Sequence, residues 1–354
     1  MGNWGNASGP GSPHYATAFG RLMRGQPRRW HPRSRITLRF IRATGLAFFC
    51  IVATRHLGAA EADCRDLEQN YAQTNVGITA IQLNTLLFSS AAKDCGALAR
   101  RLMAAGASLQ ARDRTGAMPL ARAARGGHVA LVEQFVAEGA PINARDLNGA
   151  TALYAAAEAE RPSTVAALLG RGADPNLTGR SSVSPLAAAA FRGNDRIVEL
   201  LLARRADPDH ADATGKAPIV YAAARGFASV VRRLLDAGVD AKAQYGNDLT
   251  ALMWAAGHED GVGTTAAIAA IELLIERGAV VDAADNRGRT ALMIAAERGH
   301  VAVVDMLIVR GANRDLRDKA GKTARDIASN TAVRERLAGR SEVPTTQPDT
   351  ARAP

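Results

Sequence analysis

Apolar and polar positions follow one another along most of the chain in blocks that return at a regular interval. In the clearest block, a turn segment at Asp285 precedes a short run that starts at Thr290 and contains the pair Ala295–Ala296. A second run then carries apolar residues at positions i, i+1, i+4 and i+5, namely Val303, Val304, Leu307 and Ile308. This spacing is that of one helix face. Each block therefore predicts a turn followed by two short helices.

The residues that bound these helices have matching chemistry. The Asp285 side chain can bond to the backbone of its own turn, and Gly288 permits a positive φ there. Thr290 is suited to cap the first helix, and the alanine pair keeps that helix slim so that neighbouring blocks can approach closely. Gly311 is suited to end the second helix in a left-handed conformation. The local chemistry thus predicts the same boundaries as the apolar pattern.

Two markers measure the interval between blocks. The motif that opens each block recurs at spacings of 33, 33, 33, 33, 33, 40 and 33 residues, at Thr85-Leu-Leu, Met118-Pro-Leu, Thr151-Ala-Leu, Ser184-Pro-Leu, Ala217-Pro-Ile, Thr250-Ala-Leu, Thr290-Ala-Leu and Thr323-Ala-Arg. A second marker keeps the same rhythm, at Gly106-Ala, Gly139-Ala, Gly172-Ala, Arg205-Ala, Gly238-Val, Gly278-Ala and Gly311-Ala. Two markers in one rhythm make internal repeats the organising feature of the chain.

A period of 33 residues with T-P-L-type openings, an alanine pair, a Gly-His turn and a Gly-Ala end resembles the ankyrin repeat over residues 84–339. The resemblance implies an all-α repeat solenoid of ankyrin repeats, in which helix-turn-helix units carry β-turn fingers. We expect about seven units and a C-terminal cap. Because one helix pair cannot bury its apolar stripe alone, successive units have to stack on one another.

The segments on either side of the array differ from it in composition. We expect residues 63–83 to cover its N-terminal end. The last repeat is polar and is predicted to cap the C-terminal end, with Arg325 and Asp326 where inner units have apolar or small residues. Residues 340–354 are rich in Pro and Thr and are predicted to form a disordered tail.

The formal net charge of +10 is concentrated at the N-terminus. Residues 1–62 contain nine Arg and one acidic residue, which leaves the remainder near neutrality. This basic stretch leads into 11 uncharged residues, Ala43 to Ala53, and then to Ala60-Glu61-Ala62. A basic region, an apolar region of this length and an A-x-A site are typical of a signal peptide, whereas a spanning helix needs about 20 apolar residues. We therefore predict an exported, periplasmic or secreted protein with no membrane segment after cleavage and no nucleic-acid partner.

Cysteine usage agrees with export. Cleavage after residue 62 would remove Cys50 and leave Cys64 and Cys95, an even number in an oxidising compartment. We expect these two to form a disulfide. The alternative is that both are unpaired, small apolar residues.

The single interval of 40 residues contains the most conspicuous polar stretch of the array. Seven extra residues between Thr250 and Thr290 include His258-Glu259-Asp260 and the glycines of Gly261-Val-Gly263. A dinucleotide site needs a strand before such glycines, and the repeat register places a helix there. Three adjacent residues rarely converge on one metal ion. We therefore expect a polar loop over residues 257–264, with no cofactor and no metal site.

Two repeats depart from the pattern elsewhere. Arg205 stands where the other units have Gly, and Ser181-Ser182 replace the usual Asp-x-x-Gly turn. Both positions are expected to be weak places in the array.

The family resemblance also assigns the surface that contacts partners, because ankyrin arrays bind with their turn tips and first helices. By register, the candidate partner-binding residues are Arg125, Glu158, Phe191, Arg192, Arg225, Tyr245, His258, Arg287, Glu297 and Arg298. Arg and aromatic residues are frequent at binding hot spots. We hypothesise that Phe191, Arg192 and Arg225, with Tyr245 nearby, anchor an acidic segment of a partner protein. The alternative is that Arg serves solubility and that Phe191 packs against its neighbour.

The residue patterns of common catalytic sites are missing from the sequence: it has no G-x-S-x-G, H-E-x-x-H or phosphate-loop motif. We therefore predict a non-catalytic scaffold for protein–protein interaction that uses the concave ankyrin groove, and no enzyme. Two alternatives remain: a cytoplasmic or host-directed ankyrin effector whose basic leader is not a signal, and a stress-protective binder of a cell-envelope enzyme. The oligomeric state stays open.

Overall fold

The structure is a computed structural model that describes residues 62–74, 77–259 and 261–339. The predicted leader up to residue 61 and the predicted tail over residues 340–354 lie outside the described residues. The described array belongs to one compact unit, His56–Pro354. It consists of helix pairs that follow one another along the chain.

Each pair joins a first helix to a second helix through a short turn. The pairs are α2 (Ala80–Lys93) with α3 (Gly96–Ala104), α4 (Pro119–Gly126) with α5 (Val129–Ala137), α6 (Ala152–Glu158) with α7 (Pro162–Gly170), α8 (Pro185–Arg192) with α9 (Asp195–Leu202), α10 (Pro218–Ala224) with α11 (Ala228–Asp236), α12 (Ala251–Ala256) with α13 (Thr264–Glu276), α14 (Ala291–Arg298) with α15 (Val301–Val309), and α16 (Ala324–Ile327) with α17 (Thr331–Ala338). Before α2, residues 62–74 are helical as well.

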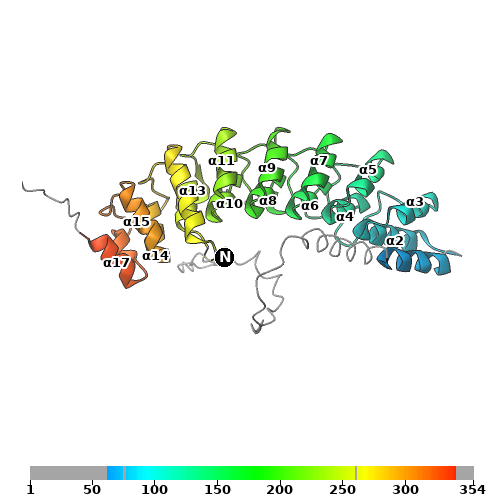
Figure 1. Cartoon of the computed structure of the whole chain (residues 1–354), viewed down its shortest axis with the longest axis horizontal. Coiled ribbons are helices and arrows are strands. Elements are labelled where there is room, and N and C mark those ends of the chain that lie inside the picture. Colours follow the sequence, from blue (N-terminus) through cyan, green and yellow to red (C-terminus); the bar gives the residue numbers. More distant parts are fainter. Residues whose placement is uncertain (1–61, 75–76, 260, 340–354) are drawn as a thin grey trace, which may run out of the picture. The chain divides into compact units, whose positions relative to one another are not determined.

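The pairs stack in sequence order, as the apolar stripe requires. Each first helix contacts the first helix of the next pair, which forms a row from α2 to α16 that we call the inner row. The second helices from α5 to α17 form the outer row in the same way. Within this unit the stack curves, and the inner row lies on its concave side (Figure 1). The structure confirms the predicted ankyrin-type solenoid.

The stacked faces bury the residues that the apolar pattern predicts. In the pair α14–α15, Val303, Val304 and Leu307 are fully buried, and Ile308 packs against the core from a partly buried position. Ala295 and Ala296 are also fully buried, which allows α14 to approach its neighbours α12 and α16 closely. Burial of a Leu or Val side chain contributes roughly 1.5–3 kcal/mol, and the contacts between neighbouring pairs supply part of this stability.

Hydroxyl side chains start most of the first helices. Thr290 Oγ1 accepts a hydrogen bond from the Met293 backbone N–H at 3.4 Å, as the sequence predicts. The same cap is formed at the start of α6, α8, α12 and α16, by Thr151, Ser184, Thr250 and Thr323. The helices α4 and α10 have no side-chain cap and begin instead with Pro119 and Pro218, whose fixed φ suits a first helical position.

The β-turn fingers between pairs use two different turns. In one, the aspartate Oδ1 accepts from the backbone N–H groups two and four residues later, at 2.7–3.1 Å, as at Asp113, Asp146, Asp212, Asp285 and Asp318. The other has a short 3₁₀ helix, η2 (Arg180–Ser182) or η3 (Gly246–Asp248), and η3 is flanked by the strands β1 (Gln244–Tyr245) and β2 (Leu249–Thr250). In these two fingers, Gly179 and Tyr245 stand where the other fingers have the aspartate. Four residues other than glycine adopt a positive φ there, namely Ser181, Ser182, Asn247 and Asp248.

The 40-residue interval lengthens a helix as well as a loop. The helix α13 has 13 residues, whereas α11 in the preceding pair has 9. The first turn of α13 lies against Gly226, where an added Cβ would come within 3.0 Å of the Ala266 carbonyl carbon. The loop expected over residues 257–264 is found between Ala256, where α12 ends, and Thr264, where α13 begins, and α13 is in addition longer than its counterpart α11. A helix, α12, does precede Gly261 and Gly263, as the repeat register predicted.

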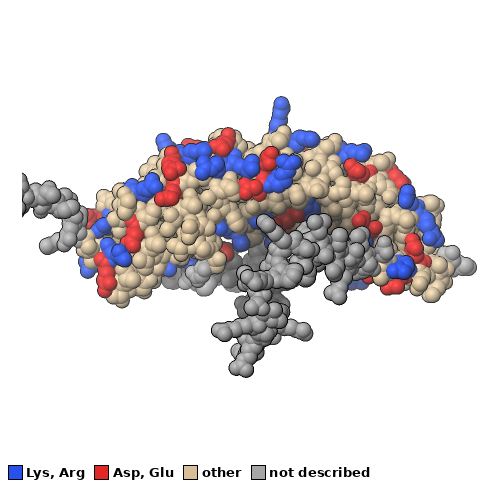
Figure 2. All heavy atoms as spheres, in the orientation of Figure 1, with Lys and Arg blue, Asp and Glu red and all other residues tan. Residues whose placement is uncertain are grey.

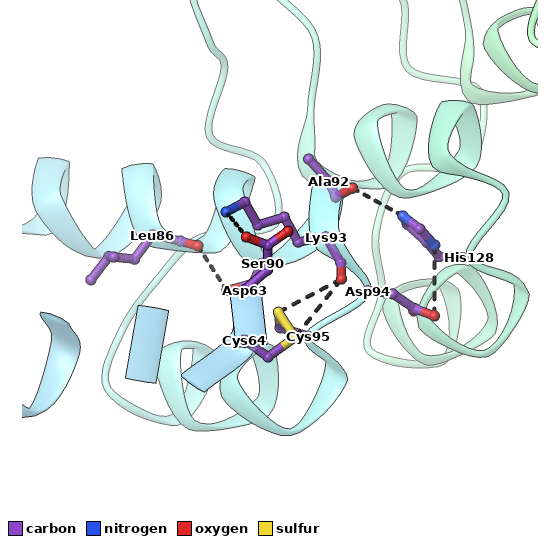
Figure 3. Close-up of a disulfide and its surroundings, with 9 residues drawn as sticks. All are labelled: Asp63, Cys64, Leu86, Ser90, Ala92, Lys93, Asp94, Cys95 and His128. Atoms are coloured by element: carbon purple, nitrogen blue, oxygen red, sulfur yellow. Dashed lines mark hydrogen bonds and ion pairs between the residues drawn. A yellow bond between two sulfur atoms is a disulfide. The ribbon is translucent and has the colours of Figure 1, made fainter. Parts of the chain in front are cut away.

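The N-terminal end of the array is covered and covalently fixed. Cys64 and Cys95 form a disulfide with a Cα–Cα distance of 5.5 Å, as the sequence predicted (Figure 3). Beside it, Lys93 Nζ pairs with Asp63 Oδ1 at 3.0 Å. Three side chains of the helical segment 62–74 pack against the core, namely Cys64, Leu67 and Tyr71. The first helix of the array begins at Ala80, inside the segment that was expected to be cover only.

The two Gly-His turns join neighbouring pairs. His128 Nε2 lies 3.0 Å from the Ala92 carbonyl oxygen, and His128 Nδ1 lies 3.6 Å from Asp94 Oδ2 (Figure 3). His300 Nε2 lies 3.2 Å from the carbonyl oxygen of His258. Both histidines therefore have a structural role between neighbouring repeats.

Arg205 adopts the conformation that Gly has in the other repeats. Its φ is 61°, in the left-handed region, and the equivalent Gly172 has a φ of 87°. A side chain in this region costs about 1–2 kcal/mol, whereas Gly is permissive there at an entropic cost of about 0.5–1 kcal/mol.

We expect Arg205→Gly to raise the free energy of unfolding by about 0.5–1 kcal/mol, because it removes this strain. The matched control is Gly172→Arg, which should lower the free energy of unfolding by a similar amount, since an added Cβ at Gly172 meets no atom within 4 Å. The midpoint of urea unfolding, followed by circular dichroism, measures both changes. A lower midpoint for Arg205→Gly would contradict the prediction.

Candidate protein-binding surface

The residues predicted to contact a partner lie mostly at the ends of the inner-row helices. Arg125 at the end of α4 and Glu158 at the end of α6 pair with each other, with 3.2 Å between Nη2 and Oε2. The Arg125 side chain is 60% exposed and that of Glu158 is 22% exposed. This ion pair links two neighbouring repeats and leaves the Arg125 guanidinium accessible from solvent.

The next two repeats bring aromatic rings and cations together. The Arg225 guanidinium carbon lies 4.6 Å from the centroid of the Phe191 ring and 5.7 Å from that of Phe227. Arg192, which is exposed, lies 6.0 Å from the same Phe191 ring. These distances are those of cation–π contacts, which hold a guanidinium in place over a ring. The structure therefore joins Phe191, Arg192 and Arg225 in one cluster, as predicted.

The Phe191 ring also meets Tyr221 edge to face, with 5.9 Å between centroids. Beyond Tyr221, Lys216 Nζ lies 4.9 Å from the ring of Trp254 and 5.9 Å from that of Tyr221. Phe191, Tyr221, Trp254, Lys216 and Arg225 are all half-buried. We call these five residues and Arg192 the aromatic–cation cluster, which extends over α8, α10 and α12.

Tyr245, predicted to lie near Phe191, belongs instead to the finger strand β1. Its hydroxyl is buried and has no hydrogen-bond partner among the described residues, and burial, with Asp209 and Asp240 nearby, raises its pKa. None of the ring contacts found in the described array joins Tyr245 to Phe191 or Arg225. The structure therefore gives no support to Tyr245 as a fourth member of that cluster.

His258 was expected in the exposed row, and this was wrong. The helix α12 ends at Ala256, so His258 lies beyond the helix at the start of the longer loop. Its side chain is 4% exposed and its ring stacks on that of His300 with 3.9 Å between centroids. The Nδ1 atom lies 3.0 Å from the Glu259 carbonyl oxygen. His258 is a packing residue because the inserted loop turns it under the next repeat.

The remaining candidates lie in the repeat α14–α15 and the finger before it. Arg287 pairs with Asp285 of its own turn, at 3.1 Å between Nη2 and Oδ2, and Glu297 accepts from Arg289. Arg298 is exposed and forms no ion pair within the described part of the chain. Only Arg298 of these three therefore has a charge that no local partner offsets.

Charges of both signs are distributed over the outside of the array. Figure 2 shows basic and acidic side chains side by side over the outer row. The outer row therefore does not present the continuous basic stripe that is typical of nucleic-acid binding. In residues 62–74, 77–259 and 261–339, no helix is long and apolar enough to span a membrane, and no group of three or more His, Cys, Asp or Glu side chains could hold a metal ion.

Sequence reasoning missed two members of the aromatic–cation cluster. These are Tyr221 and Trp254, which are absent from the predicted contact residues. Both occupy the same register position in consecutive repeats, 33 residues apart. An alignment of the repeats by position would have shown two aromatic residues next to each other on the inner row.

Comparisons with known proteins agree with this fold. Family models described as ankyrin repeats match residues 87–179 and 186–264, and a further one matches residues 274–328. Comparison with curated proteins gives no match. Among solved structures, the array is similar to the ankyrin repeat domain of Bcl-3, described as a unique member of the IkappaB protein family, with 23% identity and a TM-score of 0.54. That likeness covers 64% of this chain and 100% of the other and concerns the fold alone.

The matched residues make up more than half of the chain, and the chain belongs to the ankyrin-repeat family. Ankyrin repeats generally act as protein–protein interaction modules, and proteins of this family are typically non-catalytic binding scaffolds.

The hydroxyl of Tyr221 donates a hydrogen bond to Asp212 Oδ2. Burial opposes ionisation of Asp212, but hydrogen bonds from Tyr221, Thr214 and the Lys216 backbone outweigh it, so that the pKa of Asp212 is lowered. A carboxylate whose pKa is lower in the folded than in the unfolded chain stabilises the fold above its unfolded pKa of about 3.9. That contribution is lost as the pH falls through the lowered, folded-state pKa.

We expect Tyr221→Phe to reduce the free energy of unfolding by about 1–2 kcal/mol near pH 6, because a hydrogen bond to a charged group is removed. The loss should shrink as the pH falls through the lowered pKa of Asp212, where its carboxylate becomes protonated. Tyr245→Phe is the matched control and should cost little, since the Tyr245 hydroxyl has no partner among the described residues. Urea unfolding between pH 2 and 7 measures both variants. An equal loss at every pH would contradict the assignment.

Proposed function

We propose that this protein is an exported, non-catalytic scaffold that binds a partner protein through an acidic segment on the inner row. The contact residues are Phe191, Arg192 and Arg225. They lie at the ends of α8 and α10, on the concave side of the stack, where a segment can lie across consecutive repeats.

One observation carries the proposal: the Arg225 guanidinium lies over the rings of both Phe191 and Phe227. Its nearest carboxylate is Glu259, with 3.9 Å between Nη1 and Oε2, and its Nε is buried without a hydrogen-bond partner among the described residues. An ordered guanidinium loses little side-chain entropy when it binds a carboxylate. Such a residue, next to a half-buried ring, has the character of a binding hot spot.

Neighbouring positive charge supports the choice of an acidic partner. Arg192 is exposed, contacts the Phe191 ring and has no ion pair within the described array. Rim charges of this kind accelerate association with a partner of opposite charge and select against partners of like charge. The cluster therefore favours an acidic segment over a basic or neutral one.

Export rests on the sequence and on the Cys64–Cys95 pair. The basic leader, the uncharged stretch Ala43 to Ala53 and the Ala60-Glu61-Ala62 site have the order of a signal peptide. Disulfides persist in oxidising compartments such as the periplasm. Both features favour a periplasmic or secreted protein over a cytoplasmic effector.

Partner capture from envelope extracts tests the binding proposal. The purified array, immobilised on beads, should retain a partner protein. The Arg192→Glu variant should bind that protein with an affinity at least about tenfold lower, which corresponds to about 1.4 kcal/mol. Arg232→Glu on the outer-row helix α11 is the matched control, because Arg232 is also exposed and should not affect capture. Equal losses for both variants, or no captured protein, would overturn the proposal.

The intact mass of protein purified from the periplasm tests export. We expect a chain that starts near Asp63 and is two hydrogens lighter before reduction than after it, because the leader has been removed and one disulfide is present. A full-length chain, or one whose mass does not change on reduction, would contradict the proposed location.

A further inference from the structure

Lys216, the lysine of the aromatic–cation cluster, has no carboxylate partner in the described array. Three repeats earlier in the chain, Asp113 of the finger pairs with Arg122 of α4. The equivalent residues in the repeat of α10 are Asp212 and Tyr221, so a tyrosine replaces the arginine. Lys216 lies between them in sequence, and its ammonium group lies over the rings of Trp254 and Tyr221.

The aspartate of the same finger, Asp212, is fully engaged by other groups. Asp212 Oδ1 accepts from the Thr214 backbone and hydroxyl, at 2.7 Å each, and from the Lys216 backbone N–H at 3.0 Å. Its Oδ2 accepts from the Tyr221 hydroxyl. The carboxylate therefore serves the finger and the Tyr221 ring, and the Lys216 ammonium remains available to a carboxylate from outside.

The cluster thus has a cation at each end and rings between them. Arg225 and Arg192 contact Phe191 at one end, Lys216 contacts Trp254 at the other, and Tyr221 meets Phe191 edge to face in between. The rings come from α8, α10 and α12, which are consecutive helices of the inner row. A ligand that satisfies all of these groups has an apolar side chain between two carboxylates.

We propose that the partner segment carries a large apolar residue flanked on both sides by acidic residues, and that Lys216, Tyr221 and Trp254 form its second anchoring point. This inference rests on the proposed function and adds the chemistry of the partner. The apolar residue packs on the rings of Tyr221 and Trp254, and one flanking carboxylate binds Lys216. The other carboxylate binds Arg225 and Arg192.

Both parts of this pattern are needed for selective binding. Solvent-exposed ion pairs alone contribute little to affinity, so a purely acidic segment gains only weak, salt-sensitive attraction. A purely apolar segment leaves the Lys216 ammonium without a counter-charge in a partly desolvated contact, which is unfavourable. An apolar anchor packed on aromatic rings supplies the short-range energy, and the carboxylates fix its position.

Fluorescence of Trp254 reports directly on this anchor. In the full chain, Trp4→Phe and Trp30→Phe leave Trp254 as the one tryptophan in the sequence. Three synthetic peptides serve as probes: Gly-Asp-Glu-Phe-Glu-Asp-Gly, the same peptide with Gly in place of Phe, and the same peptide with Asn and Gln in place of its acids. We expect only the first to shift the Trp254 emission in a saturable way below millimolar concentration.

Charge removal at the anchor then tests the role of Lys216. Lys216→Gln should weaken binding of the first peptide at least fivefold. Lys242→Gln should leave it unchanged, since Lys242 is exposed in the turn after α11 and contacts none of the rings in the described cluster. The proposal is overturned if the peptide without Phe binds equally well. It is also overturned if Lys216→Gln has no effect, or if none of the peptides changes the emission.

The test separates this inference from the proposed function. A partner captured from envelope extracts that still binds Lys216→Gln with unchanged affinity would leave the scaffold function intact and remove the second anchor. Failure of the wild-type array to capture any protein would instead count against the scaffold function itself.

Discussion

The structure depends on one constraint: a single pair of short helices cannot bury its own apolar stripe. Leu186, Val198 and Leu201 are fully buried, and the side chains that cover them come largely from the helix pairs before and after their own. The period of 33 residues, the alanine pairs and the capping hydroxyls all follow from it, because each repeat has to present the same two faces to its neighbours. The same constraint makes both ends of the array vulnerable. At the N-terminal end the helical segment 62–74 and the Cys64–Cys95 disulfide provide the cover.

Features set by local chemistry could be predicted from the sequence. The cap at Thr290 and the turn at Asp285 each involve residues within four positions of each other, so the local sequence is enough to predict them. His258 could not be placed in this way, because its burial depends on where α12 ends and on the ring of His300, 42 residues later. The added length of α13 could not be predicted in this way either, because its first turn lies against Gly226 in another repeat.

The candidate site shows the same division between local and distant determinants. Phe191, Arg192 and Arg225 were predicted together because the register of the family places them on adjacent helix ends. The contribution of Tyr221 and Trp254 depends on the tyrosine that stands where Arg122 stands three repeats earlier. Its hydroxyl engages Asp212, and the Lys216 ammonium lies over the rings of Trp254 and Tyr221. Positions at the ends of the inner-row helices contribute least to stacking. They carry aromatic and charged groups such as Phe191 and Arg192, and we propose that the function of the array resides there.

The central claim is that the inner row at α8 and α10 is where this scaffold contacts another protein. Photo-crosslinking in expressing cells tests it most directly, with p-benzoylphenylalanine in place of Arg192 on the inner row or of Arg232 on the outer row. Our account predicts a discrete adduct with one other protein from position 192 and none from position 232. Adducts from position 232 alone, or equal adducts from both positions, would contradict it.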